Sequence, residues 1–280
     1  MKSKYPLVSV VIPCYNHDQF VQDSIQSVID QTYDNIELII IDDGSQDKSV
    51  IKVQEMIELC ERRFTRFEFI SRSNKGLSAT LNEALEWCRG EYFSPLASDD
   101  QMLENKTAIQ VDYLNRHLSC TAVFGGFHII DDKSQVIDTK LGLKKVYDFK
   151  KIYLHRHDLP APTAMMRLNT VKALNNYDPK IKIEDWYMWL KLSTVGNLIY
   201  LPIVMSKYRY HEDNTSKKSS LMKEERLKII NLYSDTKYFS IAEKNLKWIN
   251  MIEDNEIRGR KRFLIKNVDY LFHKILWKFL

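Results

Sequence analysis

Short apolar runs alternate with amphipathic segments along the first hundred residues, and this alternation constrains the fold more than any other feature of the chain. The apolar runs are rich in Val, Ile and Phe and cover residues 7–13, 36–41, 66–70 and 92–96. The amphipathic segments repeat apolar residues every three or four positions and cover residues 17–31, 50–59 and 77–88. Such runs are typical of buried parallel strands, and such segments of helices. The pattern predicts an α/β fold: a doubly wound, mostly parallel sheet of right-handed strand–helix–strand units, flanked by helices.

The second half of the chain is less regular. Its predicted strands cover residues 121–130, 136–138, 162–167 and 198–205. Its predicted helices cover residues 185–192, 220–248 and 262–280. We expect one domain over residues 1–255, made of halves 1–100 and 101–215 and a helical extension at 216–255, and a separate C-terminal helix at 256–280.

Charge and cysteine content exclude several classes of protein. The formal charge is +4, of which residues 258–280 carry +6, so the rest of the chain carries −2 and nucleic acid is not expected as a partner. Four scattered cysteines without a Cys-x-x-Cys pair argue against a zinc site and a disulfide framework, and suit a reducing compartment. No run approaches the roughly 18 apolar residues that span a bilayer, and no secretory signal is seen. We therefore expect a cytoplasmic protein, peripheral at the inner face of the cell membrane.

Polar residues follow the predicted strands where each strand ends. They are Tyr15-Asn16, Asp42-Asp43 and Asp99-Asp100. Ligands of doubly wound sheets bind outside the carboxyl ends of the strands, so we expect these residues to line one crevice. Two adjacent carboxylates repel each other unless a cation or hydrogen-bond donors neutralise them, and a hard divalent ion is one solution. The alternative for both acidic pairs is an ordinary turn and helix cap.

The second half offers two further candidates. Glu184-Asp185-Trp186 begins a predicted helix, where a carboxylate also interacts well with the helix dipole and a Trp is usually part of the core. His211 follows the sequence Tyr208-Arg209-Tyr210, and a lone His is more often a surface or core residue than a ligand.

The order of these motifs resembles glycosyltransferase family 2 with the GT-A fold, over about residues 5–215. The resemblance is carried by Val8–Asn16 (VSVVIPCYN), Ile40–Ser45 (IIDDGS), Asn74–Ser78 (NKGLS), Gly90-Glu91-Tyr92, Ser98-Asp99-Asp100 and Glu184-Asp185-Trp186. Two departures stand out. Thr80-Leu81-Asn82 replaces the family's frequent Ala-Arg-Asn, which puts a diphosphate contact from that helix in doubt, and Ser98-Asp99-Asp100 is a shorter acidic run than many members carry.

The resemblance implies a role for each matched position. The nucleotide would be held by Pro13, Tyr15, Asp42, Asp43, Gly76, Asn82, Ser98 and Asp99, with Asp42 accepting from the uracil ring N–H. A Mn²⁺ or Mg²⁺ ion would be held by Asp100, Asp99 and His211. Asp185 would be the catalytic base, and Glu184 and Trp186 would contact the acceptor. Residues 1–100 would then be the nucleotide-binding half and residues 101–215 the acceptor-binding half.

The implied reaction is a single, inverting displacement. A hexose or N-acetylhexosamine would pass from a UDP-sugar to a saccharide acceptor, lipid-linked through polyprenyl diphosphate, in the synthesis of a bacterial surface polysaccharide such as O-antigen or capsule. The metal would neutralise charge on the leaving diphosphate while Asp185 deprotonates the acceptor hydroxyl.

Two other classes of function are weighed against this one. A sugar-nucleotide nucleotidyltransferase has a similar sheet but a Gly-rich phosphate loop after its first strand, where this chain has Pro13-Cys14-Tyr15-Asn16. A non-catalytic metal- or sugar-binding module would leave Glu184-Asp185 without a purpose.

The C-terminal segment has an apolar stripe and a basic cluster. Leu264, Val268, Leu271, Ile275 and Phe279 recur at spacings of three or four, after four basic residues at 258–262. We expect this helix to bind an anionic membrane surface. The alternatives are packing on the body and a homodimer contact.

Overall fold

The structure is a computed structural model that describes residues 5–211 and 219–257. It divides into two compact units, Met1–Lys217 and Lys218–Leu280. The basic helix predicted at residues 262–280 lies outside the described residues. Among the residues described, no helix is both long enough and apolar enough to cross a membrane.

The first unit alternates strands and helices along its first half, as predicted. Its elements there are β1 (Val8–Cys14), α1 (Val21–Ile29), β2 (Ile36–Asp42), α2 (Ser49–Gln54), α3 (Ile57–Arg63), β3 (Arg66–Ser71), α4 (Leu77–Trp87), β4 (Tyr92–Pro95), β5 (Gln101–Met102) and α5 (Lys106–Arg116). The helix predicted at 50–59 is therefore two short helices, α2 and α3. The other predicted elements of this half are confirmed within a few residues.

The second half of this unit adds long strands and short helices. They are β6 (Cys120–Ile130), β7 (Val136–Lys140), β8 (Lys145–Tyr147), α6 (Phe149–Tyr153), the 3₁₀ turn η1 (Ala161–Thr163), β9 (Met165–Arg167), α7 (Leu168–Ala173), α8 (Glu184–Ser193) and β10 (Asn197–Arg209). The strand predicted at 162–167 begins only at Met165. Pro162 lies in the 3₁₀ turn before it, since proline has no N–H for a strand ladder.

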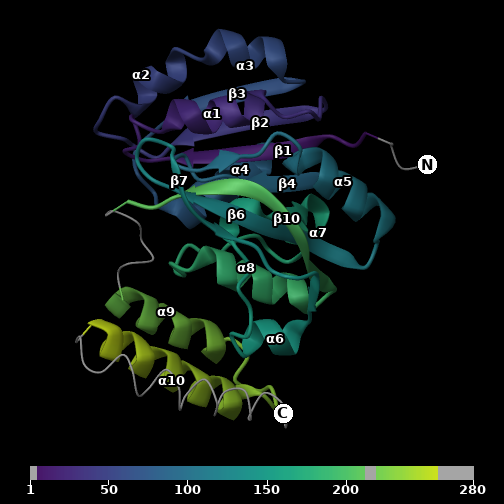
Figure 1. Ribbon diagram of the computed structural model, residues 1–280, viewed down its shortest axis with the longest axis vertical. Coiled ribbons are helices and arrows are strands. Elements are labelled where there is room, and N and C mark those ends of the chain that lie inside the picture. The colour runs from purple at the N-terminus through teal and green to yellow at the C-terminus, as the bar shows by residue number, and fades with distance from the viewer. Residues whose placement is uncertain (1–4, 212–218, 258–280) are drawn as a thin grey trace. The chain divides into compact units, whose positions relative to one another are not determined.

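One sheet runs through the first unit in the order β3-β2-β1-β4-β9-β6-β10-β5, with β7 beside β6 and β8 beside β10 (Figure 1). Strands β3, β2, β1 and β4 are parallel to one another, and β6 is parallel to β10. The short strands β5, β7, β8 and β9 are antiparallel to their neighbours. The predicted doubly wound, mostly parallel α/β sheet is thus confirmed.

The register of the central strands aligns the residues that follow them. Strands β1 and β2 are buried along almost their whole length, because their Val and Ile side chains meet helices on both faces of the sheet. Within this pairing Cys14 lies opposite Asp42, and Asp42 lies opposite Ser71. The loops after β1, β2 and β3 therefore start from one edge of the sheet.

The second unit is a pair of helices, α9 (Ser219–Asn231) and α10 (Phe239–Ile257), which contact each other. The single helix predicted at 220–248 is thus interrupted. Ser234, Asp235 and Thr236 lie in the break, and side chains of these types compete for backbone hydrogen bonds in turns.

Lys106 is a buried cation at the start of α5 and is 1% exposed. Its ammonium group donates to Ser94 Oγ at 2.7 Å and more weakly to the Ala164 carbonyl at 3.4 Å. Burial lowers the pKa of Lys106 to about 7. An unfolded chain would hold the proton up to a pKa of about 10.4. Between these two values the unfolded state binds more protons, so this group makes the folded state more stable as pH rises.

We predict that Lys106→Met removes this pH dependence. The free energy of unfolding of the parent should rise relative to that of the variant by about 2 kcal/mol between pH 7 and pH 9. Ser94 Oγ keeps its own bond to the Ala164 carbonyl at 2.9 Å, so the variant should fold. Urea denaturation at both pH values measures the difference. If the difference in unfolding free energy between parent and variant were the same at both pH values, the predicted shift in the pKa of Lys106 would be wrong.

Candidate active site

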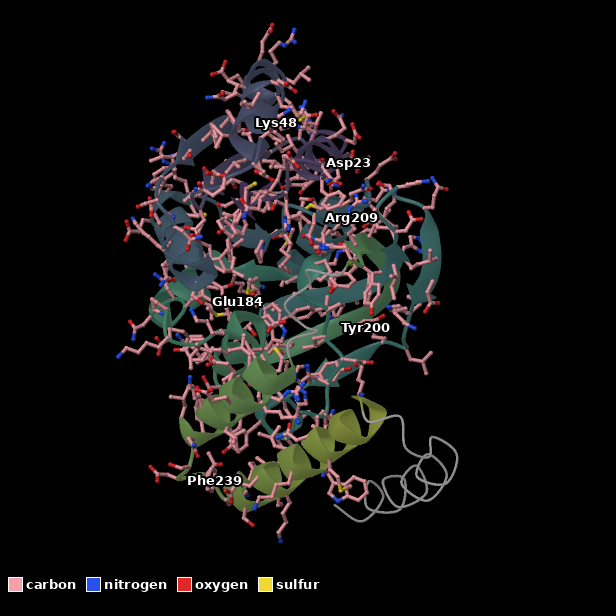
Figure 2. All side chains as sticks on the ribbon, turned by 90° about the vertical axis from the view of Figure 1, so that its left-hand side faces the viewer. Asp23, Lys48, Glu184, Tyr200, Arg209 and Phe239 are labelled. Carbon is pink, nitrogen blue, oxygen red and sulfur yellow. The ribbon has the colours of Figure 1, made fainter. Side chains whose placement is uncertain are left out.

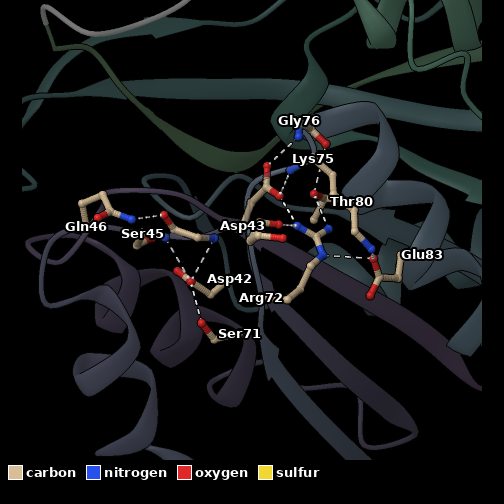
Figure 3. Close-up of polar contacts among 12 residues, drawn as sticks. Asp42, Asp43, Ser45, Gln46, Ser71, Arg72, Lys75, Gly76, Thr80 and Glu83 are labelled. Atoms are coloured by element: carbon tan, nitrogen blue, oxygen red, sulfur yellow. Dashed lines mark hydrogen bonds and ion pairs between the residues drawn. The ribbon is translucent and has the colours of Figure 1, made fainter.

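Asp42 ends strand β2 with a buried carboxylate (Figure 3). Its Oδ2 accepts from the Gly44 and Ser45 backbone N–H groups at 3.2 and 3.1 Å and from Ser71 Oγ at 3.0 Å. Its Oδ1 is also buried but has no hydrogen-bond partner among the described residues. An unsatisfied buried acceptor of this kind costs about 1–3 kcal/mol, so Asp42 presents a place for an external N–H donor.

Gly44 makes the turn after Asp42 possible. Its φ of +78° is a conformation that side chains disfavour, and a Cβ atom there would lie 2.7 Å from the Asn74 backbone nitrogen. The Asp-Asp-Gly-Ser sequence is therefore a fixed turn whose glycine allows close approach of the loop after β3.

Asp43 organises that neighbouring loop. Its carboxylate accepts from the backbone N–H groups of Lys75 and Gly76 at 2.8 and 2.9 Å and forms an ion pair with Arg72 (Figure 3). Arg72 also bonds to Thr80 Oγ1 and Glu83, at 2.8 and 3.0 Å. Asp43 thus fixes the entry to α4, and Gly76, with φ of +88°, precedes the first residue of that helix.

Tyr15 lies at the same edge of the sheet, just after β1. Its ring is about half exposed. The next residue, Asn16, has φ of +55° and is held by the Ser45 hydroxyl and the Gln46 N–H at 2.9 and 2.8 Å. Pro13, the last residue but one of β1, pairs with Ile41 beside Asp42. An aromatic face and the free Asp42 oxygen are therefore carried by neighbouring strand ends.

Asp99, His211 and His17 form a cluster that could hold a metal ion. One carboxylate oxygen and one nitrogen from each ring lie within 4.8 Å of one another. His211 Nε2 is 2.9 Å from Asp99 Oδ2, and His17 Nδ1 is 2.7 Å from Ser98 Oγ. Carboxylate and imidazole together are ligands for divalent metals, so the donor set fits such an ion.

Asp100 lies outside this cluster. Its side chain is 3% exposed and accepts the Arg209 backbone N–H at 2.9 Å. Burial, together with the adjacent Asp99 carboxylate, raises the pKa of Asp100 well above the ordinary value. Of the two predicted metal ligands Asp99 and Asp100, Asp99 is therefore the one whose carboxylate lies close to other possible ligands.

Arg209 is the fully buried cation beside this acidic pair, and Figure 2 shows it near Asp23. Its guanidinium donates to the Asp99 carbonyl at 2.9 Å, to Asp23 at 3.1 Å and to Ser134 Oγ at 3.0 Å. It also donates to the Asp131 carbonyl, and its carbon lies 4.4 Å from the Phe20 ring centre. Arg209 therefore joins the Asp99 loop to α1 and to the turn between β6 and β7.

Glu184 and Asp185 begin helix α8 as neighbouring, partly buried carboxyl groups. Burial and the Asp185 charge raise the pKa of Glu184 to about 8, and burial raises the pKa of Asp185. A carboxyl group with a raised pKa is a stronger base than an ordinary one when it is ionised. The properties of this pair suit proton transfer from a bound hydroxyl.

Helix α4 connects the start of α8 to the carboxyl edge of the sheet. Ser78 Oγ donates to the Ile181 carbonyl at 3.1 Å, and the Asn82 amide bonds to both backbone groups of Tyr177 at 2.9 Å. The loop before α8 is thus fastened to the helix that begins at Gly76. Contacts run from Asp43 through α4 to the segment that carries Asp185.

Two predicted site residues make contacts that fasten neighbouring segments. Both ends of the Asn82 amide bond to the Tyr177 backbone. Trp186 is buried and donates from Nε1 to the Ile152 carbonyl at 3.0 Å, which anchors α8.

Three site residues were missed from the sequence: His17, Arg72 and Arg209. His17 and Arg72 stand beside the motifs that carry the family resemblance, but nothing in their local sequence shows which way they point. Arg209 lies two residues before His211 and has no motif of its own.

Comparisons with known proteins identify the family of this chain. The family model "Glycosyl transferase family 2" matches residues 9–177. An uncharacterized glycosyltransferase of Haemophilus influenzae is 29% identical over 98% of this chain and 88% of its own. The chondroitin synthase of Escherichia coli is 30% identical over 81% of this chain but 32% of its own length. The chain also spans only about a third of similar uncharacterized glycosyltransferases from Rickettsia bellii and Rickettsia felis (32% and 37%).

Solved structures share the fold at low sequence identity. Staphylococcus aureus TarS 1–349, in complex with UDP-GlcNAc, has a TM-score of 0.66 at 16% identity, over 94% of this chain and 75% of that one. A Pyrobaculum calidifontis mannosyltransferase with GDP-Man and Mn²⁺ also has a TM-score of 0.66 at 16% identity, over 89% and 72%. The sheet described above is accordingly the GT-A fold of these enzymes. On the family match and the curated relatives, the chain belongs to glycosyltransferase family 2.

Proposed function

We propose that the chain transfers a hexose or N-acetylhexosamine from a UDP-sugar to a saccharide acceptor, with inversion at the anomeric carbon. The observation that carries the proposal is the buried, unpartnered Oδ1 of Asp42. Uracil presents one ring N–H, which needs one acceptor. Guanine presents two adjacent donors, whereas Oδ2 of Asp42 already accepts from three groups.

The rest of the nucleotide would lie along the same edge. The exposed face of Tyr15, with Pro13 behind it, would stack on the base, as aromatic rings do. The ribose and diphosphate would be flanked by Gly76, by Ser98 and by Asp43, which acts through the loop that it holds. TarS was crystallised with UDP-GlcNAc, which supports a donor of this class.

A divalent ion, Mn²⁺ or Mg²⁺, would be held by Asp99 and His211, with His17 beside them. When bound, it would neutralise charge on the leaving diphosphate. Asp99 takes this role in place of Asp100 because its carboxylate lies with the two rings. Arg209 would position Asp99 by donating a hydrogen bond to its backbone carbonyl.

Asp185, whose pKa is raised by burial, would take the proton of the attacking acceptor hydroxyl, and Glu184 would contact the acceptor. With one carboxylate as base and no second nucleophile, the acceptor oxygen attacks opposite the leaving diphosphate and inverts the anomeric centre.

Proton NMR of the product should show the anomeric configuration opposite to that of the donor. A product with the same configuration as the donor would contradict a single displacement.

The acceptor we propose is a lipid-linked saccharide in bacterial surface polysaccharide synthesis. Support comes from the similarity to chondroitin synthase, an enzyme named for a polysaccharide product. A panel of UDP-sugars against free and polyprenyl-diphosphate-linked saccharides, with released UDP measured, tests this. A higher rate with simple soluble saccharides would count against a lipid carrier.

We predict that Asp42→Asn weakens UDP binding by on the order of tenfold to a hundredfold, since a hydrogen bond to a charged group is lost. The amide oxygen can keep the three donors of Oδ2, which places the amide N–H₂ group where Oδ1 stood. That group repels the uracil N–H but suits the lone pair of cytosine. The preference for UDP over CDP should therefore shrink or reverse in calorimetry.

Ser71→Ala is the matched control for this variant. It removes a donor to Oδ2 but leaves Oδ1 as it is, so it should keep the UDP preference. Parent protein that binds GDP more tightly than UDP, or an Asp42→Asn variant with unchanged UDP affinity, would contradict the assignment.

We also predict that Mn²⁺ binds at Asp99. In the presence of UDP, Asp99→Asn should weaken Mn²⁺ binding by on the order of tenfold or more, as for loss of a metal ligand. Electron paramagnetic resonance titration measures free Mn²⁺, and spin-echo spectra should show imidazole nitrogen coupled to the bound ion. His128→Gln, a histidine on β6 that bonds to Thr139, is the control. Normal binding by Asp99→Asn with loss in Asp100→Asn would place the ion at Asp100 instead.

A further inference from the structure

The connection from β7 to β8 carries exposed apolar side chains that the reaction does not use. We call residues 135–146 the β7–β8 ribbon. All twelve of its residues are exposed, and five of them are large and apolar: Val136, Ile137, Leu141, Leu143 and Val146. Leu143 is 87% exposed. Single exposed apolar residues are ordinary, but five within twelve residues point to an interaction surface.

The exposure of the two leucines is built into the fold. Strand β7 pairs with β6 and strand β8 pairs with β10, so both ends of the ribbon are fixed to the sheet. Between them the Gly142 N–H donates to Tyr200 Oη at 2.8 Å. A Cβ atom on residue 142 would meet the Tyr200 ring at 3.3 Å, so glycine permits this close contact. The loop is thus pinned at its middle, with Leu141 and Leu143 on either side of the pin.

Positive charge accompanies these leucines. The ribbon holds Lys140, Lys144 and Lys145 against a single acid, Asp138. Asp138 is already paired with Lys140 at 2.5 Å. The ammonium groups of Lys144 and Lys145 lie 5.4 and 4.8 Å from the ring centres of Tyr113 and Tyr147, which hold them beside the loop. The surface is therefore both apolar and cationic.

We propose that the β7–β8 ribbon docks on an anionic lipid bilayer. Leu141 and Leu143 enter the interfacial zone, and the lysines meet lipid phosphates. A second copy of the chain fits less well, because a two-fold contact would bring the lysines of both ribbons together.

The docked ribbon would be coupled to the metal cluster. The turn that precedes β7 is held by Arg209, which donates to the Asp131 carbonyl and to Ser134 Oγ at 2.8 and 3.0 Å. Arg209 also holds the Asp99 loop. The ribbon therefore begins beside the Asp99 loop, and its two leucines lie past the other end of β7, where Lys140 pairs with Phe127.

The test is sedimentation of the full chain with vesicles, without donor or acceptor. Vesicles of phosphatidylglycerol and phosphatidylcholine are compared with vesicles of phosphatidylcholine alone. Lys144→Gln/Lys145→Gln should weaken binding to the anionic vesicles by about twentyfold, since each lysine near such a surface contributes about fivefold. Leu141→Ser/Leu143→Ser should weaken it by roughly tenfold or more, through lost apolar burial.

Matched controls lie on α2 and α3. Ile51→Ser/Leu59→Ser removes two exposed apolar side chains there, and Arg62→Gln removes an exposed charge. Both controls should bind vesicles like the parent, and thermal unfolding should show every variant folded. Ribbon variants that bind anionic vesicles as tightly as the parent would overturn the proposal. It would also be overturned if the variants kept vesicle binding but had a smaller oligomeric mass than the parent in sedimentation velocity, because the ribbon would then serve self-association.

Discussion

Mutual repulsion of carboxylates at the carboxyl edge of the sheet is the constraint on which the rest of the site depends. Asp42-Asp43 and Asp99-Asp100 are adjacent acidic pairs, and all four side chains are buried. Each pair is held by backbone N–H groups and by one arginine, Arg72 for the first and Arg209 for the second. These donors fix the carboxylates before any ligand binds. Asp42 keeps one oxygen without a hydrogen-bond partner, and Asp99 lies beside two imidazole rings; these are the residues that we propose for the nucleobase and the metal ion.

The same contacts link the proposed donor site to the proposed catalytic base. Asp43 fixes Gly76 at the start of α4, and α4 holds the loop before α8 through Ser78 and Asn82. Asp185 therefore stands on a segment fastened to the carboxyl edge of the sheet. A displacement that needs donor and base in one alignment depends on such rigid connections, because small misplacements cost large factors in rate.

Much of the fold was predictable because apolar periodicity records burial directly. The strands around Val10 and Ile39 are buried on both faces and left a continuous apolar signal. The positions of Asp42, Asp99 and Asp185 followed from strand ends and from the family resemblance. His17 and Arg209 were not predictable, since their contacts join distant positions; Arg209 meets Asp23 from 186 residues away. Asn82 and Trp186 show a second limit of prediction from sequence. A motif indicates where a residue lies in the fold, but it does not show that the side chain bonds to the backbone of a neighbouring segment.

Asp185 acting as the base of a single displacement is the central step of the proposed reaction. The most direct test measures UDP-sugar affinity and turnover in Asp185→Asn, with Glu184→Gln as the neighbouring control. The amide has nearly the shape of the carboxyl group but cannot take a proton. We predict unchanged donor affinity and a rate about 10²–10⁴-fold lower in Asp185→Asn. Glu184→Gln should lose far less. Collapse of donor affinity in Asp185→Asn, or turnover equal to that of the parent, would contradict the account.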